Sequence, residues 1–226
     1  MALGLTTSSG GEIQPYCKYD AKAGRLFRMD RVQHNDGTFS SESYEITNTA
    51  QMVMDLANIR VGWINYTSQG PVRRLVVLGK EPIPARPDDK DTNGKPAFKQ
   101  GFEIDLLLDK ASGGGGVRVL SSAAGCVIEA MDALHDAFTA AAESKAGKLP
   151  VVKISNVSPV KSGQSTNYKP NFAIVSWIDR PQPLSVTAPQ TQPSQSAPAT
   201  GSTQVSAPTQ QQAPQQAQLA DAGDFG

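Results

Sequence analysis

Positively charged and aromatic side chains are interleaved in several short segments of this chain. Trp63 and Tyr66 follow Arg60 within one such segment, and the same mixture recurs at residues 16–19, 25–28 and 168–172. Cations can contact the phosphates of a nucleic acid, and flat rings can stack on unpaired bases, each stacked base being worth about 1–3 kcal/mol. This pattern therefore indicates a surface that binds single-stranded nucleic acid. The predicted contact residues are Arg60, Trp63, Tyr66, Arg73, Arg74, Lys80 and Lys99.

Ordinary structural roles explain some of the same residues. Trp177 is better interpreted as a core residue, whereas Trp63 and Tyr66 fit a buried role and a binding role about equally well. Arginine is seldom buried without a partner, so the arginines favour an exposed position, but a plain solvated strand face accounts for them about as often. The Pro- and Asp-rich segment 80–99 could close over a bound strand or form a solvated loop.

Cysteine and histidine offer no pattern that predicts catalysis or metal binding. The two cysteines, Cys17 and Cys126, lack a CxxC spacing, and His34 and His135 are isolated from them. A structural zinc site needs four clustered ligands, so we expect two reduced, mostly buried thiols instead. No cofactor and no catalytic residue is predicted.

Acidic residues supply the one enzymatic alternative, a metal-dependent nuclease. Their spacing does not match a calcium-binding loop, which needs ligands at fixed alternate positions. Several of them also fall in a segment rich in Pro and Gly, so a nuclease is the third-ranked hypothesis, and no metal site is predicted. The acids concerned are Asp88, Asp89, Asp91, Glu103 and Asp105.

The elements that would position these residues are mainly strands. Strands are expected at 25–32, at 51–66 with a break at Asn58, and at 72–78, 102–108, 117–120, 151–157 and 172–178. Segment 79–101 should be a long exposed loop, and 158–170 should be rich in turns. Apolar residues from Val127 to Ala141 recur every three or four positions and predict one helix, capped by Ser121 or Ser122.

A mainly β fold follows, in which one helix packs on a strongly curved sheet. An oligonucleotide-binding (OB)-like barrel suits this order of elements, although a split barrel or another α+β sheet would give nearly the same pattern. The domain should span residues 12–181, after a flexible N-terminus at 1–11. Of the 21 basic and 21 acidic residues, residues 182–226 hold two acids and no base, which leaves the body 21 bases and 19 acids, about +2.

The last part of the chain has the composition of a disordered segment. Residues 182–218 consist largely of Gln, Pro, Ser, Ala and Thr, and such a segment buries too little apolar surface to offset its ordering entropy. Residues 219–226 then bring together Asp221, Asp224 and Phe225. An acidic and aromatic tip on a long linker is typical of a motif that binds a partner protein.

With these features, the chain resembles the single-stranded DNA-binding proteins of bacterial and bacteriophage replication and recombination. The resemblance rests on residues 182–226, chiefly Asp221-Ala222-Gly223-Asp224-Phe225, and on the closing segment 171–177. It implies an OB-fold core that coats single-stranded DNA and a tip that recruits replication or recombination proteins. This tip departs from the family in having only two acids and in placing Gly226 after the phenylalanine.

The sequence therefore predicts a non-enzymatic single-stranded DNA-binding protein. The alternative is a phage structural or assembly protein whose tail engages another virion component. We expect no membrane contact, because no segment approaches the ~20 apolar residues of a spanning helix, and a location in the cytoplasm of a bacterial host. The sequence does not decide between a monomer and a homo-oligomer.

Overall fold

The computed structural model describes residues 15–68, 70–114 and 116–185. The predicted flexible N-terminus, the predicted linker after Ser185 and the acidic tip lie outside these residues. No helix in the described part of the chain is long and apolar enough to cross a membrane.

Ten strands form a single sheet within the described residues. In chain order they are β1 (Tyr16–Asp20), β2 (Arg25–Gln33), β3 (Phe39–Glu45), β4 (Met52–Met54), β5 (Arg60–Thr67), β6 (Gly70–Val77), β7 (Lys99–Leu108), β8 (Arg118–Ser122), β9 (Leu149–Ser162) and β10 (Ser165–Ile178). The helices are α1 (Gly125–Ala140) and the short α2 (Ala142–Lys145), with 3-10 turns at Leu56–Asn58, Lys110–Ser112 and Gln182–Leu184. The mainly β class with one main packed helix is therefore confirmed.

The sheet branches at the turn before Ile59, which separates β4 from β5. Its main path runs β10-β9-β4-β7-β8-β1-β2-β3, whereas β5 pairs with β7 and β6. Both β4 and β5 therefore pair with β7, at opposite ends of that long strand. The break predicted at Asn58 coincides with the 3-10 turn between them. This turn directs β4 toward β9 and β10, and β5 toward a separate hairpin with β6.

The main path curls into an open half-barrel. The edge strand β10 returns to the region of β1: the N–H of Tyr168 donates to the carbonyl of Ala21, in the turn between β1 and β2, at 2.7 Å. The hydroxyl of Tyr19 donates to the Tyr168 carbonyl at 3.1 Å. These two bonds join strands that are distant along the sheet and hold the curvature.

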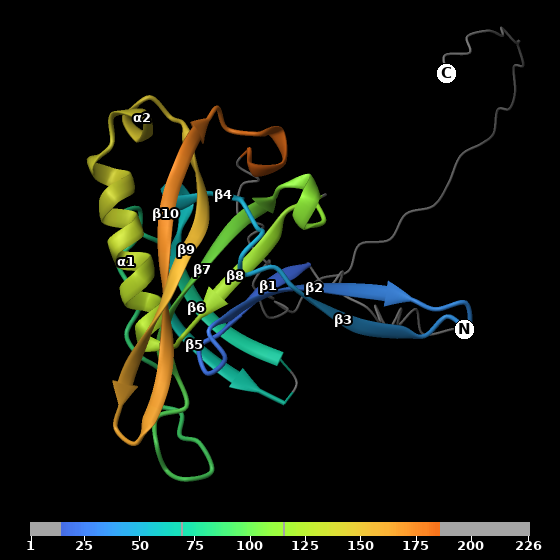
Figure 1. Cartoon of the computed structure of the whole chain (residues 1–226). Coiled ribbons are helices and arrows are strands. Elements are labelled where there is room, and N and C mark those ends of the chain that lie inside the picture. The colour runs from blue at the N-terminus through green and yellow to red at the C-terminus, as the bar shows by residue number, and fades with distance from the viewer. Residues whose placement is uncertain (1–14, 69, 115, 186–226) are drawn as a thin grey trace, which may run out of the picture. The chain divides into compact units, whose positions relative to one another are not determined.

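Helix α1 and the inner face of the curled sheet form the core. The predicted helical face is confirmed from Val127 to Phe138, since Val127, Met131, Leu134 and Phe138 are all buried, whereas Ala141 lies just past the end of the helix. Figure 1 shows α1 lying along the β9–β10 hairpin, and the ring of Phe138 stacks on that of Trp177 with centroids 6.0 Å apart. Trp177 is thus a core-packing residue, as its sequence context favoured.

Two local predictions are corrected. Ser121 and Ser122 do not cap α1, because both continue the pairing of β8 with β7, and the Ser122 hydroxyl accepts only from the N–H of Ala124, before the helix. Segment 158–170 is not a run of turns but the distal part of the β9–β10 hairpin, which reverses near Gly163 at a φ of 60°. Its prolines are tolerated because little of β9 pairs with β4 and β10 is an edge strand.

The strand β3 was not indicated by the sequence patterns. It is a polar strand whose side chains are largely exposed on both faces, so it lacks the alternation of apolar residues that marks a strand. Pairing with β2 alone holds it in place, and it forms one edge of the sheet. In Figure 1 the β2–β3 hairpin projects well beyond the rest of the sheet, and the β5–β6 hairpin projects below it.

The chain stays packed beyond Pro181. Leu184 is buried, and the guanidinium of Arg180 donates to its carbonyl at 2.8 Å. The same guanidinium binds both oxygens of the buried Asp55 at 2.6 and 2.9 Å. The end of the body is therefore tied to the region of β4 by a two-point ion pair.

Candidate nucleic-acid interface

An open cleft of about 930 Å³ is bounded by β1 and β8 on one side and by the β5–β6 hairpin on the other. The strand β7, which pairs with both β5 and β8, contributes residues between these two sides. The cleft exists because the chain branches at Leu56–Asn58 and separates this hairpin from the main path of the sheet. Small residues at the end of β8 and in the link between β8 and α1, from Ser121 to Ala124, form part of its wall. Its charged and most exposed aromatic residues are Tyr16, Lys18, Tyr66, Arg73, Lys99 and Glu103.

Two tyrosine rings are available in this cleft. Tyr16 is 40% exposed and Tyr66 is 54% exposed, although a large aromatic ring is more often substantially buried. The strand alternation of β1 explains the position of Tyr16, because Cys17 and Tyr19 turn inward to the core and leave Tyr16 and Lys18 outward. Rings presented in this way have faces on which planar groups can stack.

The charge of the cleft is predominantly positive. Lys18 and Lys99 are exposed, and neither has an ion-pair partner among the residues that the structure describes. Arg73 contributes a third cation, but its Nε lies 2.5 Å from Oε2 of Glu103. Three cations against one carboxylate leave the cleft with an excess of two positive charges, which favours an anionic ligand.

Arg60 lies next to the cleft but is committed to carboxylates. Its guanidinium donates to Oδ2 and Oδ1 of Asp105 at 2.9 and 2.7 Å, and its Nε donates to Oε1 of Glu103 at 3.2 Å. The hydrogen bonds to Asp105 are the main cause of the raised pKa of Arg60. Glu103 therefore links Arg60 to Arg73, and Arg60 supports the cleft from beside it rather than lining it.

Trp63 and Arg74 lie on the opposite face of the β5–β6 hairpin. They are cross-strand partners, and their neighbours Ile64 and Arg73 form the next pair, whose side chains point to the other face. The indole N–H of Trp63 donates to the Pro84 carbonyl at 2.8 Å. The centre of its ring also lies 5.5 Å from the guanidinium carbon of Arg86. Trp63 thus holds the predicted loop against the hairpin.

The remaining predicted contact residues are not brought to the cleft. The Nζ of Lys80 donates to Oδ1 of Asn58 at 2.8 Å, in the turn at the branch point, and Lys80 does not line the cleft. Asp221, Asp224 and Phe225 lie outside the described residues. The structure therefore gathers three of the predicted nucleic-acid contacts, Tyr66, Arg73 and Lys99, and separates the other four.

Tyr16 and Lys18 were not among the predicted contact residues. The signal that could have identified them is their alternation with two residues of core type, Cys17 and Tyr19, in a segment that mixes basic and aromatic residues. What the sequence could not show is that β1 would lie across a cleft from β5 and β6, because their distance along the chain conceals it.

Other chemistry near the cleft is limited. Cys17 contributes to its wall, but burial raises the pKa of this thiol to about 12, so it stays protonated near neutral pH. Glu103 and Asp105 bind arginines, as described above. Among the described residues, no group of three or more His, Cys, Asp or Glu side chains is placed to hold a metal ion.

Comparison with known proteins adds no relative, since no protein-family model, curated protein or solved structure matches the chain.

Proposed function

We propose that this protein binds single-stranded DNA in the cleft between β1 and the β5–β6 hairpin, with little preference for sequence. The observation that carries the proposal is the meeting of two exposed tyrosines, Tyr16 and Tyr66, with three cations in one cleft. Single-strand binding without sequence preference needs this combination, a positively charged groove along the backbone and aromatic rings for successive bases.

The dimensions and charge also fit a single strand. A cleft of about 930 Å³ is large enough for a few nucleotides but is bounded by the hairpin on one side. Unpaired bases can turn toward Tyr16 and Tyr66, whereas the bases of a duplex are stacked on each other and unavailable to the rings. The phosphates would then contact Lys18, Arg73 and Lys99.

In this proposal the C-terminal tip serves a different purpose. Asp221, Asp224 and Phe225 would recruit replication or recombination proteins to the bound strand, in the cytoplasm of a bacterial host. This part rests on the sequence resemblance, since the tip lies outside the described residues.

The test is a titration of fluorescent oligo-dT followed by anisotropy at several salt concentrations. The logarithm of the binding constant should fall with the logarithm of salt concentration, at about −0.7 per phosphate contact. The slope should be about −1.4 for Lys18 and Lys99 alone and should approach about −2 to the extent that Arg73, which is paired with Glu103, also contacts a phosphate. Binding that is absent at micromolar protein, or insensitive to salt, would refute the proposal. Cleavage of the oligonucleotide on addition of magnesium would favour a nuclease instead.

A matched pair of variants locates the site. Lys99→Gln should weaken binding and make the salt slope shallower by about 0.7, because one phosphate contact is lost. Arg74→Gln removes an exposed cation from the face of the β5–β6 hairpin that points away from the cleft, so affinity and slope should both stay unchanged. Equal losses in the two variants would mean that the protein binds by its overall charge and not through the cleft.

A further inference from the structure

The face of the sheet that carries Tyr16 and Lys18 continues onto the β2–β3 hairpin. Tyr16 pairs with Met29, and Lys18 pairs with Phe27. Directly paired residues share a face and alternate residues repeat it, so Arg31 lies on this same face of β2. We refer to this face of β1, β2 and β3 as the open face; the other face carries Cys17, Tyr19 and Leu26 into the core.

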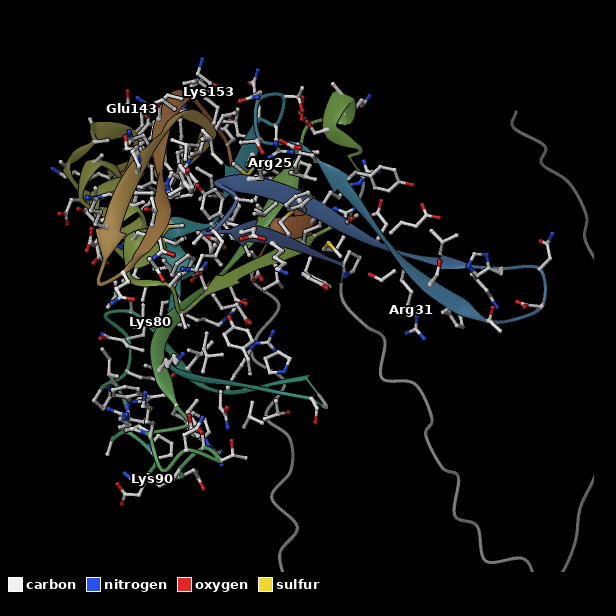
Figure 2. The ribbon with its side chains drawn as sticks, turned by 60° about the horizontal axis from the view of Figure 1, so that its bottom comes forward. Arg25, Arg31, Lys80, Lys90, Glu143 and Lys153 are labelled. Atoms are coloured by element: carbon white, nitrogen blue, oxygen red, sulfur yellow. The ribbon has the colours of Figure 1, made fainter. Side chains whose placement is uncertain are left out.

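The open face ends in an exposed pair of an arginine and a phenylalanine. Phe39 pairs with Gln33 and therefore shares the face of Arg31. The guanidinium carbon of Arg31 lies 4.1 Å from the centre of the Phe39 ring, and the ring is 51% exposed. Figure 2 shows Arg31 on the projecting part of the hairpin. The pair presents a planar surface and a cation to solvent, which are the two groups that a nucleotide can use.

The opposite face of the same hairpin holds a similar pair that is committed to the fold. There the Arg28 guanidinium lies 4.4 Å from the centre of the Tyr44 ring. However, Arg28 also donates to the Ser112 carbonyl at 2.9 Å and forms an ion pair with Asp30 at 2.7 Å, and the Tyr44 hydroxyl binds Glu42. Among the described residues, Arg31 has no ion-pair partner. Only the open-face pair therefore offers a charge that is not already neutralised.

We propose that Arg31 and Phe39 form a second contact site for single-stranded DNA, so that the bound strand continues from the cleft along the projecting hairpin. Phe39 would stack on a base, and Arg31 would contact a neighbouring phosphate while keeping the ring in place. The inference rests on the proposed function, because the strand reaches the hairpin from Tyr16 and Lys18 in the cleft. No sequence preference is implied, since every base has a stacking face.

The separation between the two sites sets the length of DNA required. Phe39 lies four residues farther along β2 than Tyr16 by register and two strands away across the sheet. With ~3.3 Å per residue and ~4.8 Å per strand, the direct separation is about 16 Å. At ~3.4 Å per nucleotide of a stacked strand, about five nucleotides bridge it, and fewer if the strand is extended. An oligonucleotide that only fills the cleft would thus miss the hairpin.

The experiment compares two oligo-dT lengths, roughly 4 and roughly 20 nucleotides. The shorter one is at the lower limit of the site sizes seen for small single-strand binding domains and is too short to fill the cleft and also reach Phe39, whereas the longer one exceeds that range. Anisotropy titrations would use the full-length protein and two alanine variants of β3. Phe39→Ala should weaken binding of the longer oligonucleotide by about fivefold to a hundredfold, the range for loss of one stacked base, and leave the shorter one within about twofold. Tyr44→Ala is the matched control: this ring is 43% exposed on the opposite face of the same strand, and neither affinity should change.

Each other result has a distinct meaning. If the wild type binds both lengths and Phe39→Ala matches it on both, the hairpin site is wrong while the cleft remains. If the wild type binds neither length, the proposed function itself fails. Equal losses for Tyr44→Ala and Phe39→Ala, or a change of oligomeric state in Phe39→Ala by sedimentation, would assign the hairpin to a structural or self-association role and overturn the inference. Phe39→Trp keeps a stacking ring and should restore binding of the longer oligonucleotide, with quenching of its fluorescence.

Discussion

Replacing Glu103 by glutamine should make DNA binding tighter. Glu103 is the one carboxylate among the charged residues named in the cleft, and its Oε2 lies 2.5 Å from Nε of Arg73. In the wild type, a phosphate must therefore compete with Glu103 for Arg73 and is also repelled by the carboxylate. Glu103→Gln removes that charge, keeps the size of the side chain, and leaves Arg60 bound to both oxygens of Asp105.

The size of the effect follows from the charges. A phosphate on the outer edge of the Arg73 guanidinium would lie roughly 8 Å from the Glu103 carboxylate, where the repulsion is about 0.5 kcal/mol in water and about 2 kcal/mol at an effective dielectric constant near 20. Affinity should therefore rise by about 2-fold to 30-fold. The free energy of unfolding should also fall, by about 1–3 kcal/mol, because the Glu103 side chain is only 13% exposed and loses charge-assisted contacts with both Arg73 and Arg60.

Anisotropy titrations of oligo-dT at several salt concentrations provide the assay. Along with tighter binding, Glu103→Gln should steepen the salt dependence by up to about 0.7, as Arg73 becomes a full phosphate contact. Glu143→Gln is the control, since it removes the same charge from α2, none of whose residues lines the cleft; Figure 2 shows Glu143 at the end of the molecule opposite Lys90. Weaker binding by Glu103→Gln in a folded protein, or an equal gain in Glu143→Gln, would show that Arg73 does not contact the phosphates.

Three further predictions concern stability and the buried thiol. Asp55→Asn should lower the free energy of unfolding by about 3–5 kcal/mol, because it leaves the charge of Arg180 without its buried partner; urea titration measures this, and a loss below 1 kcal/mol would contradict it. Gly113→Ala should also lower the free energy of unfolding, by about 1–3 kcal/mol, because φ at this position is 84° and the added Cβ would lie 1.2 Å from Nη1 of Arg28. An unchanged melting temperature would be inconsistent with this packing. Burial raises the pKa of Cys17 from 9.0 in the unfolded chain to about 12 in the fold, so the protonated thiol stabilises the folded state fully below pH 9 and this stabilisation is lost as the pH rises toward 12. Cys17→Ser should therefore flatten the fall in unfolding free energy between pH 9 and 12. A fall identical to that of the wild type would refute the assignment.

Patterns that are local in the sequence predicted most of the elements. The helical face from Val127 to Phe138 is visible because its residues recur with the helical period, and its interior packing then follows. The break at Asn58 and the long loop after β6 were also predicted, since polar and Pro- or Gly-rich segments interrupt strands directly. The predicted loop of 79–101 extended too far, because β7 already begins at Lys99. The strand β3 was missed because it is polar on both faces and depends on pairing with β2, which is a contact and not a pattern.

The candidate site was predictable only in part. Tyr66, Arg73 and Lys99 were predicted from residue type and do line the cleft. Arg74 and Trp63 were equally good candidates by type. Neighbouring residues along a strand, however, lie on opposite faces of the sheet, so Arg73 faces the cleft and Arg74 does not. Composition alone does not reveal which of the two faces will point toward distant strands.

Taken by itself, the amino-acid sequence determined the mainly β class, the single main helix and the mixture of cations and aromatic rings, because each depends on neighbours along the chain. Only the tertiary structure decided which of these residues face one another. The turn at Leu56–Asn58 divides the pairing of β7 between β4 and β5, and the curl of the sheet then sets Tyr16 and Lys18 of β1 across from Tyr66 of β5. Such contacts between distant segments arise from strand pairing and burial of the shared core, which no short stretch of sequence encodes.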